Sequence, residues 1–324
     1  MDRVLGRSGI KVSEIGFGCW AIGGPFTAGG GGANGWGESD DGESTAAIRR
    51  ALELGITFFD TADVYGAGHS EQVLGRALGG HRDEVVIATK FGYTFDAGRR
   101  EVTGEDASSA YIRRACRASL RRIGTDRIDL YQLHLGELPV NRAQEVVGTL
   151  EGLVSEGLIR AYGWSTDDPQ RAAAFARGAH CAAVQHELNV LADDAGMLAV
   201  CGTFDLASVN RGPLAMGLLT GKYGPAARLP VDDVRSAQPW VGYFADGRPA
   251  PQWLARLDAI REVLTSGERT LAQGALCWLL ARSPRTVPIP GIRTVAQAEQ
   301  NAAPLRQGPL TPAEMAQITQ LLGS

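Results

Sequence analysis

Four ionisable side chains in the first half of the chain follow directly or closely after short apolar segments of the sequence. Asp60 ends the apolar run at residues 56–59, and Tyr65 lies in the glycine-bearing loop that follows. Lys90 and His134 stand at the ends of two further apolar runs. Each run is short enough to be a buried strand. Since α/β barrels carry their chemistry at the carboxyl ends of the strands, these four residues are candidates for catalysis.

Together the four groups suit the reduction of a carbonyl. A tyrosine phenol has a reference pKa near 10, and an ammonium such as Lys90 favours the phenolate and lowers that pKa. Asp60 would pair with the ammonium and hold it, while His134 would hydrogen-bond the same substrate oxygen. The set therefore predicts a proton donor aimed at a carbonyl oxygen. No side chain in it supplies hydride, so the pattern implies a nicotinamide.

Other interpretations of these residues stay open. Taken singly, an aspartate can close a turn, a tyrosine can pack on it, a lysine can be solvated and a histidine can fill a core position. Lys90 would also suit the Schiff-base amine of a barrel lyase or isomerase. Asp60 beside it would keep the amine charged, which disfavours nucleophilic chemistry. Four such groups on three neighbouring strand ends favour the catalytic interpretation.

Segments of strand length alternate with amphipathic segments of helix length along the chain. This alternation predicts parallel βαβ units, and eight of them favour an α/β fold with a closed (β/α)8 TIM barrel. We expect a single barrel domain over residues 1–324. The expected strands are 15–19, 56–59, 84–88, 128–133, 159–163, 182–185, 206–209 and 286–289. The expected helices are 47–52, 71–78, 112–123, 146–154, 170–177, 195–200, 253–264, 271–280 and 295–301.

Two further elements are expected at the ends of the chain. Residues 4–13 predict an N-terminal β-hairpin, because two short apolar pairs flank a glycine-bearing turn. Thr311, Pro312 and Glu314 combine an N-cap, a first-turn proline and a capping box, which predicts an extra C-terminal helix over 313–322.

Local signals also bear on the segments around the candidate residues. Ser70 is expected to cap the helix at 71–78. Residues 23–37 are rich in glycine, yet they lack the strand, GxGxxG and helix order of a phosphate cradle. We interpret them as a mobile loop whose Phe26 and Trp36 cover a ligand.

Composition excludes several classes of protein. The chain has 324 residues, a net charge of −4 and a pI near 5.8, so it carries no electrostatic footprint for nucleic acid or an anionic membrane. No apolar run reaches the roughly 20 residues of a membrane span, and residues 1–12 lack an apolar signal region. We therefore expect neither a nucleic-acid nor a membrane partner.

The cysteines and histidines give no sign of a metal or a disulfide frame. The five cysteines are scattered and lack a CxxC pair, which favours a reducing cytoplasm over an oxidising compartment. The five histidines show no helical metal-ligand spacing, so we expect no metal.

Longer motifs around the four candidates resemble a known family. The stretches FFDTADVYGAGHSE, ATKFG, IDLYQLH and PIPGIR are similar to aldo-keto reductases, more narrowly to the bacterial branch close to the potassium-channel β-subunits. The resemblance covers nearly the whole chain. It implies that Asp60, Tyr65, Lys90 and His134 form the catalytic tetrad. In that arrangement Tyr65 is the general acid, Lys90 and Asp60 tune it, and His134 orients the carbonyl or assists proton transfer.

The same resemblance implies NADPH/NADP bound in an extended form across the barrel mouth. It assigns the carboxamide to Ser165 and Gln185, the diphosphate to the stretch LAMGLLTGK and the adenosine to PGIRTVAQAEQN. The complete set of expected cofactor-binding residues is Cys19, Trp20, Asp60, Ser165, Thr166, Gln185, Arg211, Gly212, Pro213, Leu214, Gly217, Leu219, Gly221, Lys222, Gly291, Arg293, Gln297, Gln300 and Asn301.

Several positions depart from the family pattern. Thr166 stands where the family usually has an asparagine, and Arg211 stands where an aromatic residue often stacks on the nicotinamide. A planar guanidinium can also stack. Gln300 and Asn301 replace a Glu–Asn pair and keep the capacity to bond adenine. Arg293 is placed to pair with a 2′-phosphate, which favours NADP over NAD; its alternative role is a solvated loop charge.

The resemblance implies an NADPH-dependent oxidoreductase that reduces an aldehyde or ketone to an alcohol. A nicotinamide-binding regulatory subunit with little turnover is the alternative. The substrate class, the physiological direction and the oligomeric state, a homo-oligomer included, stay open. Aromatic residues of three loops are expected to line the substrate pocket: Trp36, Tyr93, Phe95, Trp240, Tyr243 and Phe244.

Overall fold

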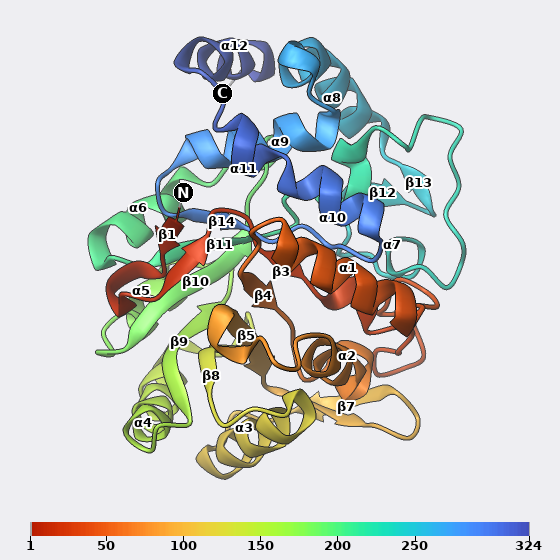
Figure 1. The fold of residues 1–324 in the computed structure, drawn as a ribbon. Coiled ribbons are helices and arrows are strands. Elements are labelled where there is room, and N and C mark those ends of the chain that lie inside the picture. The colour runs from red at the N-terminus through yellow and green to blue at the C-terminus, as the bar shows by residue number, and fades with distance from the viewer. Residues whose placement is uncertain (1, 324) are drawn as a thin grey trace.

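The computed structural model describes residues 2–323, and its centre is a sheet of eight parallel strands. The sheet has the order β14-β11-β10-β9-β8-β5-β4-β3. In Figure 1 these strands curve around a common centre and the helices lie outside them. The strands are β3 (Phe17–Gly18), β4 (Phe58–Asp60), β5 (Val86–Phe91), β8 (Ile128–Leu133), β9 (Ile159–Ser165), β10 (Cys181–Glu187), β11 (Ala207–Arg211) and β14 (Thr286–Pro288).

The two edges of the sheet meet and close it. Gly18 and Gly291 form a parallel bridge between the first strand and the residues after the last one. The amides of Gly16 and Gly18 donate to the carbonyls of Pro288 and Pro290 at 2.8 and 2.9 Å. The predicted closed (β/α)8 barrel is confirmed, because edge strands β3 and β14 satisfy each other's backbone groups.

The helices surround the barrel, as the alternation in the sequence predicts. Those that follow strands are α1 (Asp41–Glu53), α2 (His69–Ala77), α3 (Ser109–Ile123), α4 (Ala143–Ser155), α5 (Pro169–Phe175), α6 (Ala195–Phe204), α9 (Leu271–Arg282) and α10 (Val295–Ala302). The additional helices are α7 (Val234–Ala237), α8 (Pro251–Leu264), α11 (Pro304–Gln307) and α12 (Pro312–Leu322). Helices α8 and α12 pack together beside the barrel, at the top of Figure 1.

The expected capping box starts α12. The Thr311 hydroxyl accepts from the amide of Glu314, and the Glu314 carboxylate accepts from the amide of Thr311. Pro312 occupies the first turn, where its missing amide costs no hydrogen bond.

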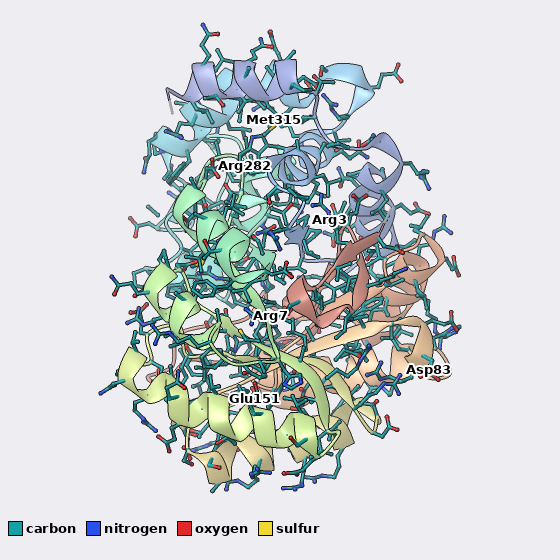
Figure 2. All side chains as sticks on the ribbon, turned by 90° about the vertical axis from the view of Figure 1, so that its left-hand side faces the viewer. Arg3, Arg7, Asp83, Glu151, Arg282 and Met315 are labelled. Atoms are coloured by element: carbon teal, nitrogen blue, oxygen red, sulfur yellow. The ribbon has the colours of Figure 1, made fainter. Side chains whose placement is uncertain are left out.

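An N-terminal hairpin closes the bottom of the barrel. Strands β1 (Asp2–Val4) and β2 (Lys11–Ser13) pair antiparallel, as predicted. Arg3 donates to the carbonyl of Leu280 at 3.0 Å and Arg7 donates to that of Ala176 at 3.1 Å, and both arginines are labelled in Figure 2. Leu5 of the hairpin is buried in the cluster of apolar side chains that fills the barrel interior.

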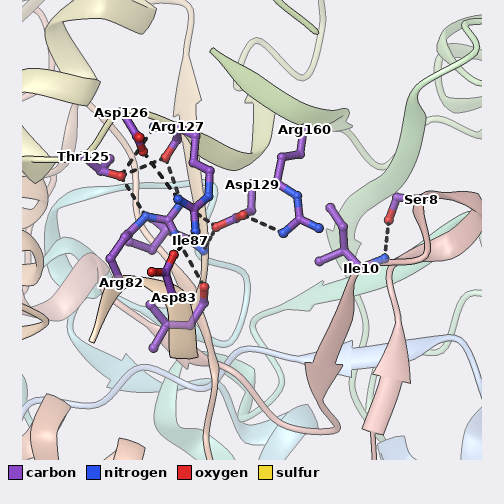
Figure 3. A network of polar contacts seen from close by, with 11 residues as sticks. Ser8, Ile10, Arg82, Asp83, Ile87, Thr125, Asp126, Arg127, Asp129 and Arg160 are labelled. Carbon is purple, nitrogen blue, oxygen red and sulfur yellow. Dashed lines mark hydrogen bonds and ion pairs between the residues drawn. The ribbon is translucent and has the colours of Figure 1, made fainter. Parts of the chain in front are cut away.

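A buried carboxylate ties neighbouring strands together on the outside of the barrel. Asp129 of β8 pairs with Arg82 at 2.8 Å and with Arg160 at 3.0 Å, and it accepts from the amide of Ile87 at 2.9 Å (Figure 3). Asp129 is fully buried, so these three donors compensate the loss of water around its charge.

Side chains alternate along β8, and this alternation decides what faces the barrel interior. Leu130 belongs to the interior cluster, whereas Tyr131 and Leu133 pack under the helices. Gln132, two residues after Leu130, therefore faces inward near the carboxyl end of the strand.

Three features of the fold differ from the sequence-based expectation. A hairpin of β6 (Tyr93–Asp96) and β7 (Glu101–Glu105) follows β5. A smaller hairpin of β12 (Phe244–Ala245) and β13 (Arg248–Pro249) lies before α8. The prediction that Ser70 caps a helix is wrong. The N-cap of α2 is Gly68, and Ser70 lies within the helix and donates to the carbonyl of Cys19 at 2.8 Å.

The glycine-rich loop is tied down at several points. Thr27 forms bridges with Ala33 and Glu101, which connects the loop to β7.

Within residues 2–323, no helix combines the length and the apolar character that a membrane crossing requires.

Barrel closure gives a prediction about stability. An alanine at Gly18 would place its Cβ 2.7 Å from the carbonyl oxygen of Ile289, across the closing edge. We expect Gly18→Ala to lower the free energy of unfolding by about 2 kcal/mol, because backbone must move to relieve the overlap. Urea denaturation measures the change. Gly291→Ala is the matched control, because a Cβ there meets no atom of the described chain within 4 Å; equal losses in both variants would contradict the prediction.

Candidate active site

A buried ion pair joins the ends of β4 and β5. The Lys90 ammonium lies 2.5 Å from Oδ1 of Asp60, and both side chains are almost completely buried. Lys90 also donates to the carbonyl of Thr61 at 2.8 Å and to the Tyr65 hydroxyl at 3.2 Å. The three hydrogens of the ammonium therefore each have an acceptor.

A tight turn brings Tyr65 back over this pair. Tyr65 begins the 3-10 turn η3 (Tyr65–Gly68), in which Gly66, Ala67 and Gly68 all have positive φ angles of 59°, 56° and 98°. A Cβ on Gly66 would lie 1.9 Å from the carbonyl oxygen of Gly23. Glycine is thus required at position 66 by both conformation and space.

His134 completes the group from the end of β8. Its amide donates to the carbonyl of Phe91 at 2.8 Å, which aligns the residue with the end of β5. The imidazole meets Tyr65 edge to face, with ring centroids 5.7 Å apart, and Tyr93 at 5.3 Å. Its Nδ1 is buried and has no hydrogen-bond partner among residues 2–323. The structure thus brings all four sequence-predicted catalytic candidates together.

The charges in this cluster shift its proton affinities. Burial lowers the pKa of Lys90, but the Asp60 carboxylate and the Tyr65 phenol raise it more, so Lys90 stays an ammonium. Burial raises the pKa of Tyr65, and Lys90 opposes that rise without reversing it. The phenol therefore stays protonated at neutral pH. Burial and then the charges of Lys90 and Arg211 hold the pKa of His134 well below its usual range, so the imidazole is neutral.

Sequence reasoning missed Gln132. Its amide nitrogen donates to Oδ2 of Asp60 at 3.0 Å, and Gln185 donates to the same oxygen at 2.8 Å. The signal was present in the motif IDLYQLH, because strand alternation puts position 132 on the same face as His134. Only the closed barrel reveals that β8 and β10 both direct an amide at the end of β4.

Aromatic rings cover the cluster. Trp20 stacks on Tyr65 with centroids 5.9 Å apart, and it also stacks on Trp240 at 6.2 Å. Trp36 meets Trp20 edge to face at 5.3 Å. Trp240 is more than half exposed, so it forms the solvent side of this wall.

Two of the expected pocket residues are buried. Tyr243 and Phe244 lie in an apolar cluster with side chains of α8 and α9; that they line the substrate pocket stays a prediction. The Tyr243 hydroxyl donates to Glu187 and lies 2.9 Å from the amide of Asn189, which explains how a phenol is accommodated there. Tyr93 and Phe95 pack, as Tyr65 does, against the apolar cluster of Phe26, Ala62 and Val64.

The expected carboxamide and first-strand residues surround the same end of the barrel. Cys19 and Trp20 follow β3, Ser165 ends β9, and Gln185 lies in β10. The hydroxyl of Thr166, in the loop after β9, donates to the carbonyl of Gly136 at 2.8 Å, so it connects this loop to the loop after β8.

Arg211 is held by carboxylates at the end of β11. Its guanidinium forms ion pairs with Asp167 and, at 3.8 Å, with Glu187. The group is about 38% exposed, and its charge acts on both Tyr65 and His134. Two carboxylates thus pair with this guanidinium beside the cluster.

The segment after β11 has an unusual backbone. Ala215, Met216 and Gly217 have successive positive φ angles of 48°, 54° and 94° within the turn η6 (Ala215–Thr220). Arg235 donates to the carbonyl of Met216 at 3.0 Å and is itself paired with Asp233, which holds this backbone in place. Other expected cofactor residues in or next to this segment are Gly212, Pro213, Leu214, Leu219, Gly221 and Lys222.

The adenosine-side residues gather at the start of α10. Gln297 accepts from the amide of Arg293 at 2.8 Å, and Arg293 donates to the carbonyl of Trp36 at 3.1 Å. Gln300 donates to the N-cap hydroxyl of α9, and Asn301 is buried. Arg293 has no carboxylate partner within residues 2–323, so its charge is available.

A cavity of about 510 Å³ lies beside the glycine-rich loop. Its lining comes from that loop, from Arg99 and Arg100 of the β6–β7 turn, and from Val231 and Asp232. Phe26, which lines the cavity, belongs to the apolar cluster against which Trp20 and Tyr65 pack.

Comparison with known proteins defines the class. The model of the aldo/keto reductase family matches residues 14–322. The chain belongs to the aldo/keto reductase family.

Named relatives agree with this assignment. The chain is 31% identical to the aldo-keto reductase yakc [NADP(+)] of Schizosaccharomyces pombe, over 91% of this chain and 84% of that protein. The holo form of aldo-keto reductase AKR11C1 from Bacillus halodurans matches with a TM-score of 0.79 and 30% identity, covering 99% of this chain and 95% of the other. An aldo/keto reductase from Klebsiella pneumoniae in complex with NADP and acetate matches with a TM-score of 0.70 and 29% identity, with the same coverage.

The depressed pKa of His134 predicts a pH dependence of stability. In the unfolded chain the imidazole of His134 takes up a proton near pH 6.5, whereas in the folded chain it stays neutral at that pH. The stability that this group contributes is therefore present above about pH 6.5 and is lost as the pH falls below that value. We expect the free energy of unfolding to fall by about 1 kcal/mol more in the wild type than in His134→Asn between about pH 6.5 and pH 5.5. Urea denaturation at both pH values measures this difference, and equal slopes would contradict it.

Proposed function

We propose that this chain is an NADPH-dependent reductase that converts an aldehyde or a ketone to an alcohol. The observation that carries the proposal is the Lys90 ammonium, which lies between Asp60 at 2.5 Å and the Tyr65 hydroxyl at 3.2 Å. Membership of the aldo/keto reductase family supports it, as do the NADP(+) in the name of the fission-yeast relative and the NADP in the Klebsiella structure.

In the proposed mechanism, Tyr65 is the general acid. A nicotinamide, when bound, would supply the hydride that the carbonyl carbon accepts. The phenol, which burial keeps protonated, gives its proton to the carbonyl oxygen. Lys90 stabilises the phenolate that remains, and Asp60 holds Lys90 in position. The neutral His134 hydrogen-bonds the same oxygen and orients the carbonyl.

The residues at the barrel mouth suit the dinucleotide. Ser165 and Gln185 take the carboxamide, and the planar guanidinium of Arg211, which pairs with Asp167 and Glu187, takes the stacking position on the nicotinamide. The backbone around Gly217 takes the diphosphate. The unpaired charge of Arg293 takes the 2′-phosphate, which is why we assign NADPH rather than NADH.

The first experiment is a fluorescence titration of the purified protein with NADPH and with NADH, followed by a panel of carbonyl compounds. The panel includes small aldehydes, aryl ketones and nucleotide-linked keto sugars, and reduced-nicotinamide absorbance reports turnover. NADPH-selective binding with turnover supports the reductase. Binding without turnover of any compound favours the alternative of a regulatory subunit, and no binding rejects both.

Replacement of the general acid separates chemistry from binding. We expect Tyr65→Phe to lower kcat by at least about 100-fold, because only the proton donor is removed. The Kd for NADPH is expected to stay within about threefold of the wild type, because the ring that Trp20 stacks on is kept. Tyr131→Phe is the matched control, because the Tyr131 hydroxyl is buried and unpartnered in the described chain, away from the cluster. Turnover close to wild type in Tyr65→Phe would reject Tyr65 as the acid.

Cofactor selectivity tests the adenosine side. Charge-assisted contacts to one group are worth about 1.5–3 kcal/mol, so we expect Arg293→Ala to weaken NADPH binding by about 10- to 100-fold. NADH lacks the 2′-phosphate, and its Kd is expected to change by less than about threefold. Lys222→Ala is the comparison variant, because the loss of a contact to the diphosphate is expected to weaken the binding of NADPH and of NADH alike. An equal loss for NADPH and NADH in Arg293→Ala would remove Arg293 from the phosphate site.

A further inference from the structure

The carboxylate of Asp60 is held from two sides. Its Oδ1 accepts from Lys90 at 2.5 Å, and its Oδ2 accepts from the amides of Gln132 at 3.0 Å and Gln185 at 2.8 Å. A carboxylate only accepts hydrogen bonds, so both glutamines must present their nitrogen to it. Gln132 then directs its own oxygen toward Gln185, whose nitrogen lies 3.4 Å away.

We propose that Gln132 is a positioning residue for the reduction: by holding Oδ2 of Asp60, it keeps Oδ1 directed at Lys90 and thereby keeps the ammonium within reach of Tyr65. This inference rests on the proposed function and adds a residue to it. Gln132 itself acts only through Asp60.

The geometry gives Gln132 this role because of how an aspartate side chain moves. Rotation of a carboxylate about its last bond is broad and soft. Two fixed points are needed to define its plane, and in this site they are Lys90 at one oxygen and the amide pair at the other. Gln132 is fully buried on β8, next to β5, which carries Lys90. Its amide is thus delivered by the barrel and not by a flexible loop.

The electrostatic consequence reaches Tyr65. The charged and titratable groups that face the Tyr65 ring are Lys90, Asp60, His134, Tyr93 and Arg211. Among them Lys90 lowers the pKa of Tyr65 and Asp60 raises it, after the larger effect of burial. The N–H dipole of Gln132 offsets part of the negative charge on Asp60. Without that dipole, more of the negative charge of Asp60 acts on the phenol, and Asp60 no longer keeps the Lys90 ammonium beside it, so the pKa of Tyr65 rises further.

The test uses Gln132→Met, which keeps the length of the side chain and removes its donor. The titration of Tyr65 is read without turnover, as the tyrosinate absorbance of each protein minus that of its Tyr65→Phe counterpart. We expect this titration to move to higher pH by about half a unit to one unit, and kcat to fall by about 10-fold with the basic limb of its pH profile shifted in the same direction. The Kd for NADPH is expected to stay within about threefold.

Two comparison variants separate the amide from packing. Leu130→Met changes the same face of the same strand at a position with apolar surroundings, and we expect it to leave the titration of Tyr65 unmoved. Gln132→Glu places a second carboxylate against Asp60, and we expect a larger loss of kcat than in Gln132→Met because like charges repel there. Gln132→Leu replaces the methionine variant if that variant does not fold.

Two results would overturn the assignment. An unmoved Tyr65 titration together with a lower melting temperature would mean that Gln132 only fills space. An unmoved titration with a rise in the Kd for NADPH of 10-fold or more would mean that Gln132 acts through Gln185 and not through Asp60. Failure of the proposed function is a separate result: the wild-type protein would then reduce no carbonyl compound. The titration of Tyr65 needs no turnover, so it would still test the role of Gln132 in that case.

Discussion

The ion pair of Lys90 and Asp60 is the interaction on which the rest of the site depends. Both groups lie inside the barrel, where an unpaired charge would be costly, and each is compensated by further hydrogen bonds. Lys90 donates to the carbonyl of Thr61 and to the hydroxyl of Tyr65. Asp60 accepts from the side-chain amides of Gln132 on β8 and Gln185 on β10. Because these hydrogen bonds fix the position of Lys90, its ammonium stays beside the Tyr65 hydroxyl and can stabilise the negative charge that forms when the phenol loses its proton.

The barrel interior has an apolar part and a polar part, and the Lys90–Asp60 pair lies in the polar part. Its lower part is filled by apolar side chains such as Leu130 and by Leu5 of the N-terminal hairpin, which closes the bottom. Its upper part carries the polar cluster, and strained backbone surrounds it: the turn after Tyr65 and the segment around Met216 both use left-handed residues. Strain of this kind persists only where packing enforces it, and here the two strained segments border the proposed acid and the proposed diphosphate site.

The glycine-rich loop links the two halves of the site. Trp36 stacks edge to face on Trp20, which stacks on Tyr65, and the carbonyl of Trp36 accepts from Arg293. The ring of Trp36 also lies over the guanidinium of Arg235, which holds Met216. One loop thus contacts Arg293 directly and is linked through Trp20 to Tyr65 and through Arg235 to the segment around Met216. The sequence predicted its role as a cover, but not the contacts that hold it in place.

The sequence by itself determined the order of the strands, the closed barrel and the convergence of Asp60, Tyr65, Lys90 and His134. These follow from local periodicity and from the rule that parallel strands share one carboxyl edge. Tertiary structure alone decided which side chains meet across strands, because strand register and closure set those distances. It brought Gln132 to Asp60, directed Thr166 to the loop after β8 and set the hydroxyl of Tyr243 against Glu187 at the end of β10. It also moved the N-cap of α2 to Gly68, after a turn in which Gly66 and Ala67 have positive φ angles and Gly66 packs against Gly23, which is distant in sequence.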